Sequence, residues 1–538
     1  MAKPKIPNQK KKYQELNGRL NRYVALVEQI YDTLNLEAAK AVSRTKYSPD
    51  SDKPFKWSDY PQTKKQIDDI QKHFVEDINA TIYRGTTEEW KNSNEAQDLI
   101  ANKVLIAYNA QVDREKYKVL YQTNSGALKA FQNRKDKGFN ISAKLWQQSM
   151  IYKEELEAAI SCAIQKGTSA VTLSKQISKY LLDFPLLQKD YKDRYGSAEH
   201  IQDCEYRSIR LARSEINMAY RTAENERWKQ MDFVVGYEIK LSSSHHSRMP
   251  HGDICDTLAG KYPKDFTWTG WHPNDLCYKV PILKTEEEFW EWDGRSDVST
   301  ESINEVKDVP DEFKKWVLEN HQKIEKAQKR NTLPYFLRDN KSIVQNINTE
   351  NSAKELVNRA SLVGNEVQSL AESIAKKNKG FVTPINYKSI SSITRKVTTE
   401  GITPYDIKDA VRTTIIVPRS QIDQVLNELS ESDSFVRLKR QKTESFMGYS
   451  GNIVNIQTSN GLIAEIQVNT ERMIYAKEKP EDAKRILGEK RWKEIQKQTG
   501  MEGGLGHKYY EEWRVLDKAD KKAQKIAEKS IEYYSHFQ

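Results

Sequence analysis

Cysteine is scarce in this sequence and long apolar runs are missing, and each shortage excludes a class of protein. Only four cysteines occur among 538 residues, so we expect no disulfide framework and a reducing compartment. No apolar run reaches about 18 residues, the length that a spanning helix needs, so we expect no membrane span. The first residues, Met1 to Pro7, lack the apolar core of a secretory signal, so export would need another vehicle.

What the sequence does contain is charge and aromatic rings. Charged residues make up 30% and hydrophobic residues 37%, and 11 Trp with 27 Tyr argue against a wholly disordered chain. A chain of this length exceeds one hydrophobic core, so we expect about two to four domains. The net charge of +10 fits either a solvated basic surface or a partner that carries phosphate, and charge alone does not choose between them.

The pattern along the chain predicts four regions. Residues 1–200 carry apolar stripes at helical spacing and no catalytic constellation, which predicts a helical scaffold. Residues 201–295 begin with a long helix and continue as a small β-rich unit with cysteines and histidines. Residues 296–344 are a polar linker. Residues 345–538 alternate strands and helices, so the expected fold is multidomain, mainly α at first and then α+β with a mixed or antiparallel sheet.

Two pairs of soft metal ligands lie in the second region. His251 precedes Cys255 and His272 precedes Cys277, with three and four residues inside the pairs and sixteen between them. Such spacing can close a tetrahedral structural Zn²⁺ site, although the region contains no Cys-x-x-Cys. Two alternatives stay open: buried cysteines and hydrogen-bonded histidines without a metal, or a catalytic metal site. The catalytic alternative would use His245, His246 and Asp253.

The same region resembles a family of phage proteins. Arg213-Ser-Glu215 lies on a predicted helix, where residues two apart do not face each other, so each is expected to pair elsewhere. With Cys255 to Gly260 and Trp271 to Cys277, this segment is similar to the Mu F-like minor head proteins of tailed phages. The resemblance covers about residues 100–295. It implies portal and capsid proteins as partners, a place inside the phage head, and, in some members, a C-terminal toxin delivered with the genome. Lys279 stands where the family pattern has its last cysteine.

The last region contains the residues best suited to polyphosphate chemistry. Ile463 to Val468 alternates, so Glu465, Gln467 and Asn469 are expected to share one face of a strand. Such a row is often a solvated surface. Basic residues just upstream favour an anion site instead, because clustered cations need a counter-charge. These basic residues are Lys388, Lys396 and Arg412.

Five ordered motifs within this region resemble the synthetase domain of the RelA/SpoT family. The matching residues are Lys388, Ser392 and Lys396; Asp409 and Arg412; Gly448 and Tyr449; Glu465 and Gln467; and His507 with the aromatic Tyr510. The resemblance implies a nucleotide pyrophosphokinase, which transfers pyrophosphate from ATP to a ribose 3'-hydroxyl. Such a reaction depends on charge neutralisation and positioning, which fits the residue types present.

The resemblance also implies a role for each matching residue. Lys388, Ser392, Lys396 and Arg412 would bind ATP; Asp409 and Glu465 would hold Mg²⁺ and act in catalysis; Tyr449, Gln467 and His507 would contact the acceptor. A hard cation such as Mg²⁺ prefers carboxylate oxygens. Asp406 is an alternative to Asp409, because Asp406 has the same strand parity as Arg412, whereas Asp409 would need a β-bulge.

Two departures from the motifs bear on the acceptor. Asn386 replaces the first arginine of the family pattern, and Ile453 replaces a histidine, which favours adenosine nucleotides as acceptors. Guanosine nucleotides, as in (p)ppGpp synthetases, and the tRNA 3' end stay open. We therefore expect a phage-encoded toxin that makes (p)ppApp-type alarmones in the cytoplasm of a target cell, with an immunity protein covering its active site. A purely structural capsid protein with a nucleotide- or DNA-binding tail is the other alternative.

Overall fold

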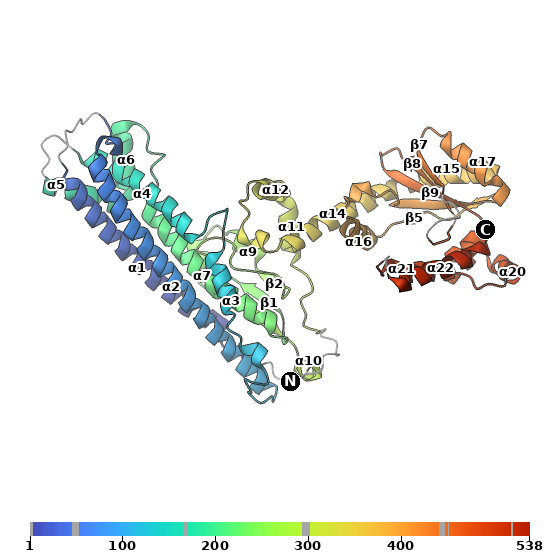
Figure 1. The fold of residues 1–538 in the computed structure, drawn as a ribbon, viewed down its shortest axis with the longest axis horizontal. Helices are drawn as coiled ribbons and strands as arrows, with labels where there is room; N and C mark the ends of the chain where they lie inside the picture. The colour runs from blue at the N-terminus through green and yellow to red at the C-terminus, as the bar shows by residue number, and fades with distance from the viewer. Residues whose placement is uncertain are drawn as a thin grey trace. The chain divides into compact units, whose positions relative to one another are not determined.

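The computed structural model describes residues 4–45, 53–164, 170–292, 302–440, 447–449, 451–517 and 520–537. It divides into two compact units, Met1–Lys341 and Ser342–Gln538 (Figure 1). The predicted boundary near residue 345 lies close to this division. The three regions predicted before it remain predictions, and residues 296–301 of the predicted linker lie outside the described residues. None of the described helices combines the length and apolarity that a membrane crossing requires.

Long amphipathic helices build the first unit. They are α1 (Gln9–Ser43), α2 (Pro61–Ala107), α4 (Ile141–Ala163) and α7 (Cys204–Gln230). The Asn8 side chain caps α1 by accepting the Lys11 amide at 3.1 Å. Pro61 opens α2, where its missing N–H costs no hydrogen bond. These local signals start the helices, and their buried apolar stripes then hold α1, α2 and α7 together.

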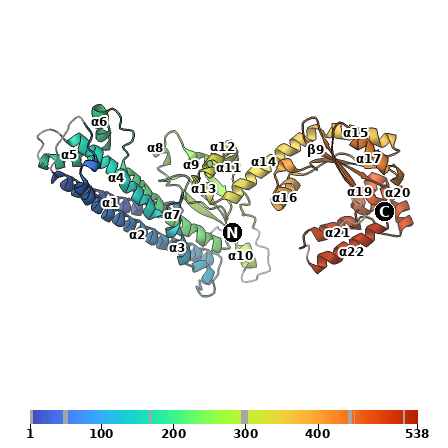
Figure 2. The same ribbon diagram turned by 45° about the horizontal axis from the view of Figure 1, so that its top comes forward.

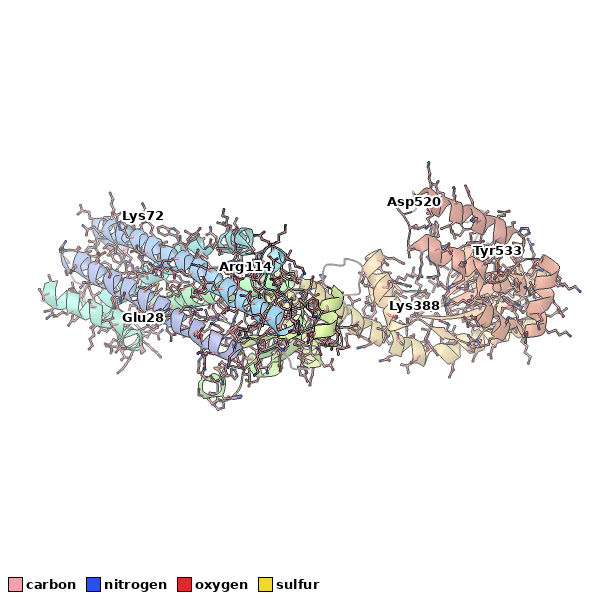
Figure 3. All side chains as sticks on the ribbon, turned by 90° about the horizontal axis from the view of Figure 1, so that it is seen from below. Glu28, Lys72, Arg114, Lys388, Asp520 and Tyr533 are labelled. Carbon is pink, nitrogen blue, oxygen red and sulfur yellow. The ribbon has the colours of Figure 1, made fainter. Side chains whose placement is uncertain are left out.

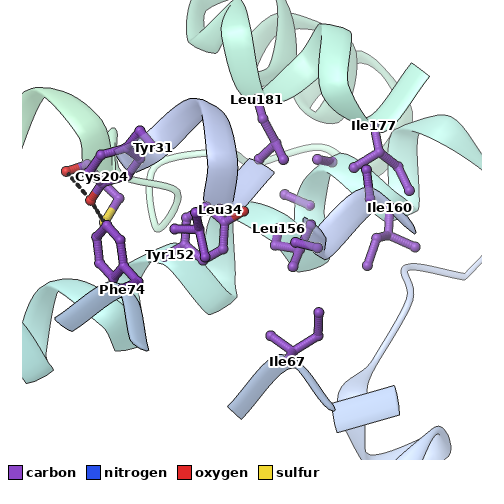
Figure 4. Packing of buried hydrophobic residues seen from close by; sticks show 14 of the residues in the cluster. Tyr31, Leu34, Ile67, Phe74, Tyr152, Leu156, Ile160, Ile177, Leu181 and Cys204 are labelled. Atoms are coloured by element: carbon purple, nitrogen blue, oxygen red, sulfur yellow. Dashed lines mark hydrogen bonds between the residues drawn. The ribbon is translucent and has the colours of Figure 1, made fainter. Parts of the chain in front are cut away.

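Aromatic side chains form part of the core of this unit (Figure 4). The rings of Tyr31 and Phe74 meet edge to face at 4.8 Å. The Tyr31 hydroxyl, which is buried, bonds Ser208 Oγ at 2.7 Å and donates to the Cys204 carbonyl oxygen at 3.1 Å. Burying a phenol therefore leaves no unmet hydrogen bond here, and helix α7 is tied to α1 by both packing and polar contacts.

The predicted long helix and the following strand of the central region are confirmed. Helix α7 leads into β1 (Val234–Lys240), which pairs antiparallel with β2 (Gly260–Tyr262) and β3 (Tyr278–Leu283). On α7, Arg213 donates to Asn21 Oδ1 at 2.8 Å. Glu215 instead pairs with Arg134 at 2.5 Å and with Lys144 at 3.5 Å. The expectation that Arg213 and Glu215 pair elsewhere is therefore correct.

A mixed sheet forms the centre of the second unit. Its strand order is β4-β6-β9-β8-β7, and β5 also pairs with β6. Strands β6 and β9 are parallel, whereas the other neighbours are antiparallel. The strands are β4 (Phe381–Val382), β5 (Asn386–Tyr387), β6 (Val411–Ile416), β7 (Phe435–Arg440), β8 (Asn452–Gln457) and β9 (Ile463–Asn469). The mixed sheet expected for the α+β region is thus present.

Helices cover the two faces of this sheet differently. Helices α14 (Lys341–Leu362), α15 (Gly364–Lys377) and α17 (Ile422–Ser430) contribute to one core with the apolar strand residues. A second core joins Ile416 to the C-terminal helices α18 (Glu471–Lys477), α19 (Pro480–Leu487), α20 (Glu489–Thr499) and α22 (Lys521–Ser535). Both Figures 1 and 2 show α21 (Leu505–Arg514) beside α22, on the side of the sheet away from α15 and α17.

Gly85 lies where α2 packs tightly against α7. A Cβ at Gly85 would lie 2.5 Å from Ile216 Cδ1 and 3.3 Å from Tyr23 Cε1. Alanine normally favours a helix over glycine by about 1 kcal/mol. Because Ile216 is buried and cannot move aside, we expect Gly85→Ala to lower the stability of the first unit by about 1–3 kcal/mol. Calorimetric unfolding of the full chain measures this change.

Gly18 is the matched control for that substitution. It lies within α1, and a Cβ there would meet no atom within 4 Å. We expect Gly18→Ala to raise stability by up to about 1 kcal/mol. An equal rise for Gly85→Ala would contradict the close packing of α2 on α7.

Candidate active site

A row of polar side chains crosses the sheet of the second unit. The register aligns Asn386 of β5 with Arg412 of β6. It also aligns Arg412 with Glu465 of β9, and Glu465 with Asn455 of β8. Aligned residues on paired strands project to the same face. A guanidinium and a carboxylate from two parallel strands therefore lie next to each other on one face of the sheet.

The other face of the same strands is apolar. Ala464, Ile466 and Val468 are at most 1% exposed and pack in the core with α15 and α17. Glu465 is half-exposed, and Gln467 follows it on the polar side. The predicted alternation of β9 is confirmed, although among its polar residues only Glu465 is partly exposed, whereas Gln467 and Asn469 are buried.

Hydrogen bonds fix the orientation of the polar residues on β9. Gln467 Nε2 donates to Glu465 Oε1 at 2.7 Å, and Lys477 Nζ donates to Gln467 Oε1 at 2.8 Å. Asn469 Nδ2 donates to the Tyr449 hydroxyl at 2.9 Å, and the ammonium of Lys477 lies 5.3 Å from the centre of the Tyr449 ring. The residues of the third and fourth predicted motifs are thus part of one connected network.

Lys477 is a functional candidate that the sequence does not reveal. Burial would lower its pKa, but the Tyr449 phenol and the Glu478 carboxylate raise the pKa further than burial lowers it. The ammonium therefore stays charged. No local motif marks Lys477, because its position next to Gln467 arises only when α18 packs back along β9.

Two lysines and an aspartate form the second part of the site. Lys388, labelled in Figure 3, follows β5, and its backbone N–H donates to the Ala410 carbonyl at 2.9 Å. Lys388 Nζ forms an ion pair with Asp409, and Lys396 Nζ lies 3.3 Å from Asp409 Oδ1. Burial raises the pKa of Asp409, but the two ammonium groups more than offset burial and hold the pKa below its usual range. Asp409 is therefore a carboxylate that keeps two cations together.

Asp406 has a different role. It is the third residue of a short helical turn, Pro404–Asp406, and its carboxylate accepts from the Thr403 N–H at 2.9 Å and from the Thr403 hydroxyl at 2.7 Å. The bond from the Thr403 N–H belongs to a capping box, in which the Asp406 N–H also donates to the Thr403 side chain. Strand β6 begins only at Val411, so strand parity does not extend back to Asp406 or Asp409. The structure places Asp409, not Asp406, with the lysines, and no bulge is needed.

Ser392 and His507 lie at the starts of two helices. Ser392 is in the first turn of α16 (Ile390–Glu400), where its hydroxyl accepts from Ser389 at 2.9 Å. His507 lies in the first turn of α21 and is half-buried. In the described part of the chain, no hydrogen bond or ion pair joins either residue to Arg412 or Glu465.

The positions that depart from the synthetase motifs both lie on the polar face. Asn386 pairs with Arg412, and Ile453 of β8 pairs with Gln467. An amide and an aliphatic side chain thus occupy places where the motif pattern has an arginine and a histidine. These departures alter the surface around the acidic and basic residues and leave those residues in place.

A separate cavity opens at the carboxyl ends of β6 and β9. It has a volume of about 780 Å³ and is lined by Asn469, Arg419, Arg472 and Phe381, among others. Neither Arg412 nor Glu465 lines this cavity, because both residues lie toward the amino ends of their strands. Asn469 therefore connects the polar face to a basic cavity that the motifs do not mark.

The predicted metal ligands of the first unit come together only in part. Cys255 Sγ lies 3.2 Å from His272 Nε2. The ligand atoms of His245, Cys255 and Cys277 all lie within 4.8 Å of one another. His251 is exposed and belongs to none of the close groups of ligand atoms found among the described residues. Of the four residues predicted from spacing, Cys255 and Cys277 form one close group with His245, and Cys255 and His272 form another with Asp253.

Comparison with known proteins relates part of the chain to one relative. Over 170 residues the chain is 38% identical to the (p)ppApp synthetase toxin Tas1 of Pseudomonas aeruginosa (strain UCBPP-PA14). This match spans 31% of the chain and 38% of Tas1, so the chain covers well under half of that relative. No protein-family model matches the chain.

Solved structures also match part of the chain, among them the following two. One is the complex between the Type VI effector Tas1 and its immunity protein, with 35% identity over 35% of this chain and 96% of that chain, and a TM-score of 0.33. The other is the small alarmone synthetase 1 from Bacillus subtilis, with 18% identity over 34% of this chain and 92% of that chain, and a TM-score of 0.23. From the sequence match, about a third of this chain is related to a synthetase toxin.

Proposed function

We propose that the second unit is a toxin that transfers pyrophosphate from ATP to the 3'-hydroxyl of an adenosine nucleotide. The observation that carries the proposal is the pairing of β6 with β9, which sets Arg412 beside Glu465 on a polar face. Lys388 is bonded to the start of that same region through Ala410. Cations that can bind a polyphosphate thus lie close to a carboxylate that can accept a proton from a hydroxyl group.

The three cations would bind the ATP phosphates. Arg412 is exposed and forms no ion pair within the described ranges, so its guanidinium is available to a phosphate. Lys388 and Lys396 are held by Asp409 in the absence of substrate. A triphosphate carries more charge than one carboxylate and would draw both ammonium groups toward it. Asp409 therefore keeps the lysines in position until ATP arrives.

The carboxylates fit a divalent cation. One oxygen of Glu465 accepts from Gln467, and no described residue donates to its other oxygen. Asp409 supplies the second carboxylate once its lysines bind phosphate. Mg²⁺ prefers such oxygen ligands, and when bound it supplies positive charge to the transferring phosphates. Glu465 and Asp409 are the residues that would hold it.

The chemical step follows from these positions. Glu465 accepts the proton of the acceptor 3'-hydroxyl, and the hydroxyl oxygen forms a bond to the β-phosphorus of ATP. The bond between that phosphorus and the oxygen bridging to the α-phosphate breaks, and AMP leaves with the oxygen. Arg412, Lys388 and Lys396 stabilise the negative charge that accumulates on the phosphates. The acceptor then carries a 3'-pyrophosphate.

Tyr449 and Asn469 support adenosine as the acceptor base. The Tyr449 ring is held by Asn469 and can stack on a purine. Asn469 Oδ1 is buried and accepts no hydrogen bond from a described group, so it can accept one from an exocyclic amino group. Adenine carries such a donor at C6 and guanine carries one at C2, so the preference for adenine rests on the C6 edge of the base facing Asn469. The name of the relative, a (p)ppApp synthetase, points the same way.

The first unit would act as the carrier of this enzyme. We propose a phage head protein, on the resemblance of Arg213 to Glu215 and of the Cys255 to Cys277 segment to that family. A cell that produces such a toxin needs protection, so we propose a cognate immunity protein that covers the face around Glu465. Detection of the full chain in purified phage particles from producing cells would test the carrier role, and its absence from them would overturn it.

The acceptor assay tests the proposed activity directly. The purified full chain is mixed with labelled ATP and AMP, ADP, ATP, GDP, GTP or tRNA in turn, and AMP release and products are measured. We expect AMP release and 3'-pyrophosphorylated products with adenosine nucleotides. Release only with GDP or GTP would make the chain a (p)ppGpp synthetase, and release only with tRNA would make it an RNA modifier.

Glu465→Gln should abolish most of this activity. Replacing the carboxylate by an amide removes both the proton acceptor and a metal ligand, so we expect kcat to fall by about 10²–10⁴-fold. Glu489→Gln is the matched control, since Glu489 is exposed and, among the described residues, forms an ion pair with Lys493 alone. Full activity of Glu465→Gln would refute the proposed role of this face.

Lys388→Met and Lys396→Met should weaken ATP binding. A charged hydrogen bond to phosphate contributes about 1.5–3 kcal/mol, so each substitution should raise KM for ATP by about tenfold or more. Lys408→Met serves as the control, because Lys408 lies one residue from Asp409 but is exposed. Steady-state kinetics at varied ATP concentration measures KM for the two variants and the control. An unchanged KM in both Lys388→Met and Lys396→Met would show that these lysines do not bind ATP.

A further inference from the structure

We propose that His245, Cys255, His272 and Cys277 bind a structural zinc ion in the first unit. His245 begins the short helix α8 (His245–Arg248), and Cys255 lies in α9 (Ile254–Leu258). His272 and Cys277 come from the segment that leads into β3. The ion would therefore join three segments that are separate in the chain. This inference concerns the first unit and is independent of the proposed enzyme.

The contacts of His272 indicate that a cation belongs between the side chains. His272 Nδ1 lies 2.7 Å from the Pro273 carbonyl oxygen, which can only accept, so Nδ1 carries the proton. In the neutral ring the lone pair on Nε2 then faces Cys255 Sγ at 3.2 Å and Asp253 Oδ2 at 3.2 Å. A lone pair against a carboxylate oxygen is repulsive unless a cation or a second proton lies there. Backbone support of the distal nitrogen is the usual arrangement of a metal-bound histidine.

His245 has the complementary arrangement. Its Nε2 lies 2.9 Å from Asp256 Oδ2, and a carboxylate at that nitrogen makes it the donor. The lone pair is then on Nδ1, the other ring nitrogen. A carboxylate behind a histidine raises the basicity of the nitrogen that holds a metal. His245 is only 5% exposed, which is unusual for a histidine without a function or a full set of bonds.

The two cysteines supply soft, buried ligands. Cys255 and Cys277 are each 1% exposed and are free thiols, not a disulfide. With two imidazole nitrogens they make the two-cysteine, two-histidine set that suits Zn²⁺. Zinc bonds of about 2.0–2.3 Å place tetrahedral ligands about 3.3–3.8 Å apart. The ligand atoms of His245, Cys255 and Cys277 already lie within 4.8 Å of one another, and His272 Nε2 lies 3.2 Å from Cys255 Sγ, so side-chain rotations would bring the four atoms together.

The elements that carry the proposed ligands are short. Helix α8 has four residues and α9 has five, too short to be stable alone. Residues 263–277 form neither helix nor strand. Asp253 further connects the segments, since Oδ1 accepts the Cys255 N–H at 2.7 Å and lies 3.7 Å from His245 Nε2. A zinc ion would fix these segments against the sheet of β1 and β3.

The test uses the full chain carrying Glu465→Gln, so that the proposed toxin does not limit production. We expect about one zinc ion per chain by elemental analysis after purification without chelator. Cobalt substitution should give an intense thiolate-to-cobalt charge-transfer band and the visible spectrum of a tetrahedral ion. Removing the metal with a chelator should lower the unfolding temperature of the first unit. Absence of bound zinc together with no cobalt spectrum would overturn the proposal.

Matched variants identify the ligands. Cys255→Ser, Cys277→Ser and His245→Ala should each lose the metal or most of its affinity. His251→Ala should keep it, because His251 lies outside the cluster, and so should Cys162→Ser, a buried cysteine in the helical core. Loss of metal in His251→Ala with retention in His245→Ala would overturn the ligand set. If a ligand variant fails to fold, cobalt titration and chelation of the parent chain still decide whether a metal is bound.

Discussion

The register between β6 and β9 is the constraint on which the second unit depends. In this parallel pairing, Arg412 is aligned with Glu465 while the neighbouring Thr413 is aligned with Ile466. A slip by one residue would turn Ile466 to the polar face and bury Glu465 in the core. Burying an unpaired carboxylate costs several kcal/mol, so the apolar packing that folds the sheet also sets the position of the acidic group.

The ion pairs around Asp409 then assemble the rest of the site before any substrate binds. Without Asp409, the ammonium groups of Lys388 and Lys396 would repel each other. Burial acts to raise the pKa of Asp409, yet the lysines lower it overall. Because the folded-state pKa is depressed, the stabilisation is fully present above the unfolded-state pKa and is lost as pH falls through the folded-state pKa. At neutral pH the lysines therefore stay paired and positioned.

Much of this site could be predicted because its signals are local. The alternation of β9 marks the face of Glu465, Gln467 and Asn469 without knowledge of the fold. The choice between Asp406 and Asp409 could not be made in this way, since both precede β6 and strand parity does not apply to a turn. Lys477 also escaped detection, because its partner Gln467 is brought to it by helix packing.

Spacing along the chain was similarly limited for the cysteines and histidines. It identified Cys255, His272 and Cys277 as neighbours, but it favoured His251 over His245. The number of intervening residues limits the distance between two side chains. It does not determine which side chains of a short helix point toward the core. Helix α8 begins at His245 and holds that imidazole inward, whereas His251 lies in the exposed turn that follows. The direction of a four-residue helix is set by its tertiary contacts.

Lys279, which stands where the phage head pattern has its last cysteine, has a structural role in the first unit. Its ammonium is fully buried and lies 3.2 Å from Glu224 Oε2 on α7, with the ring of Trp228 4.6 Å away. Burial lowers the pKa of Lys279 to about 8, and Glu224 opposes that shift. Removing one partner of such a pair costs about 3–5 kcal/mol, so Lys279 is committed to joining β3 to α7. A lysine cannot act as the last thiolate of that pattern, so the proposed zinc site would take His245 as its fourth donor.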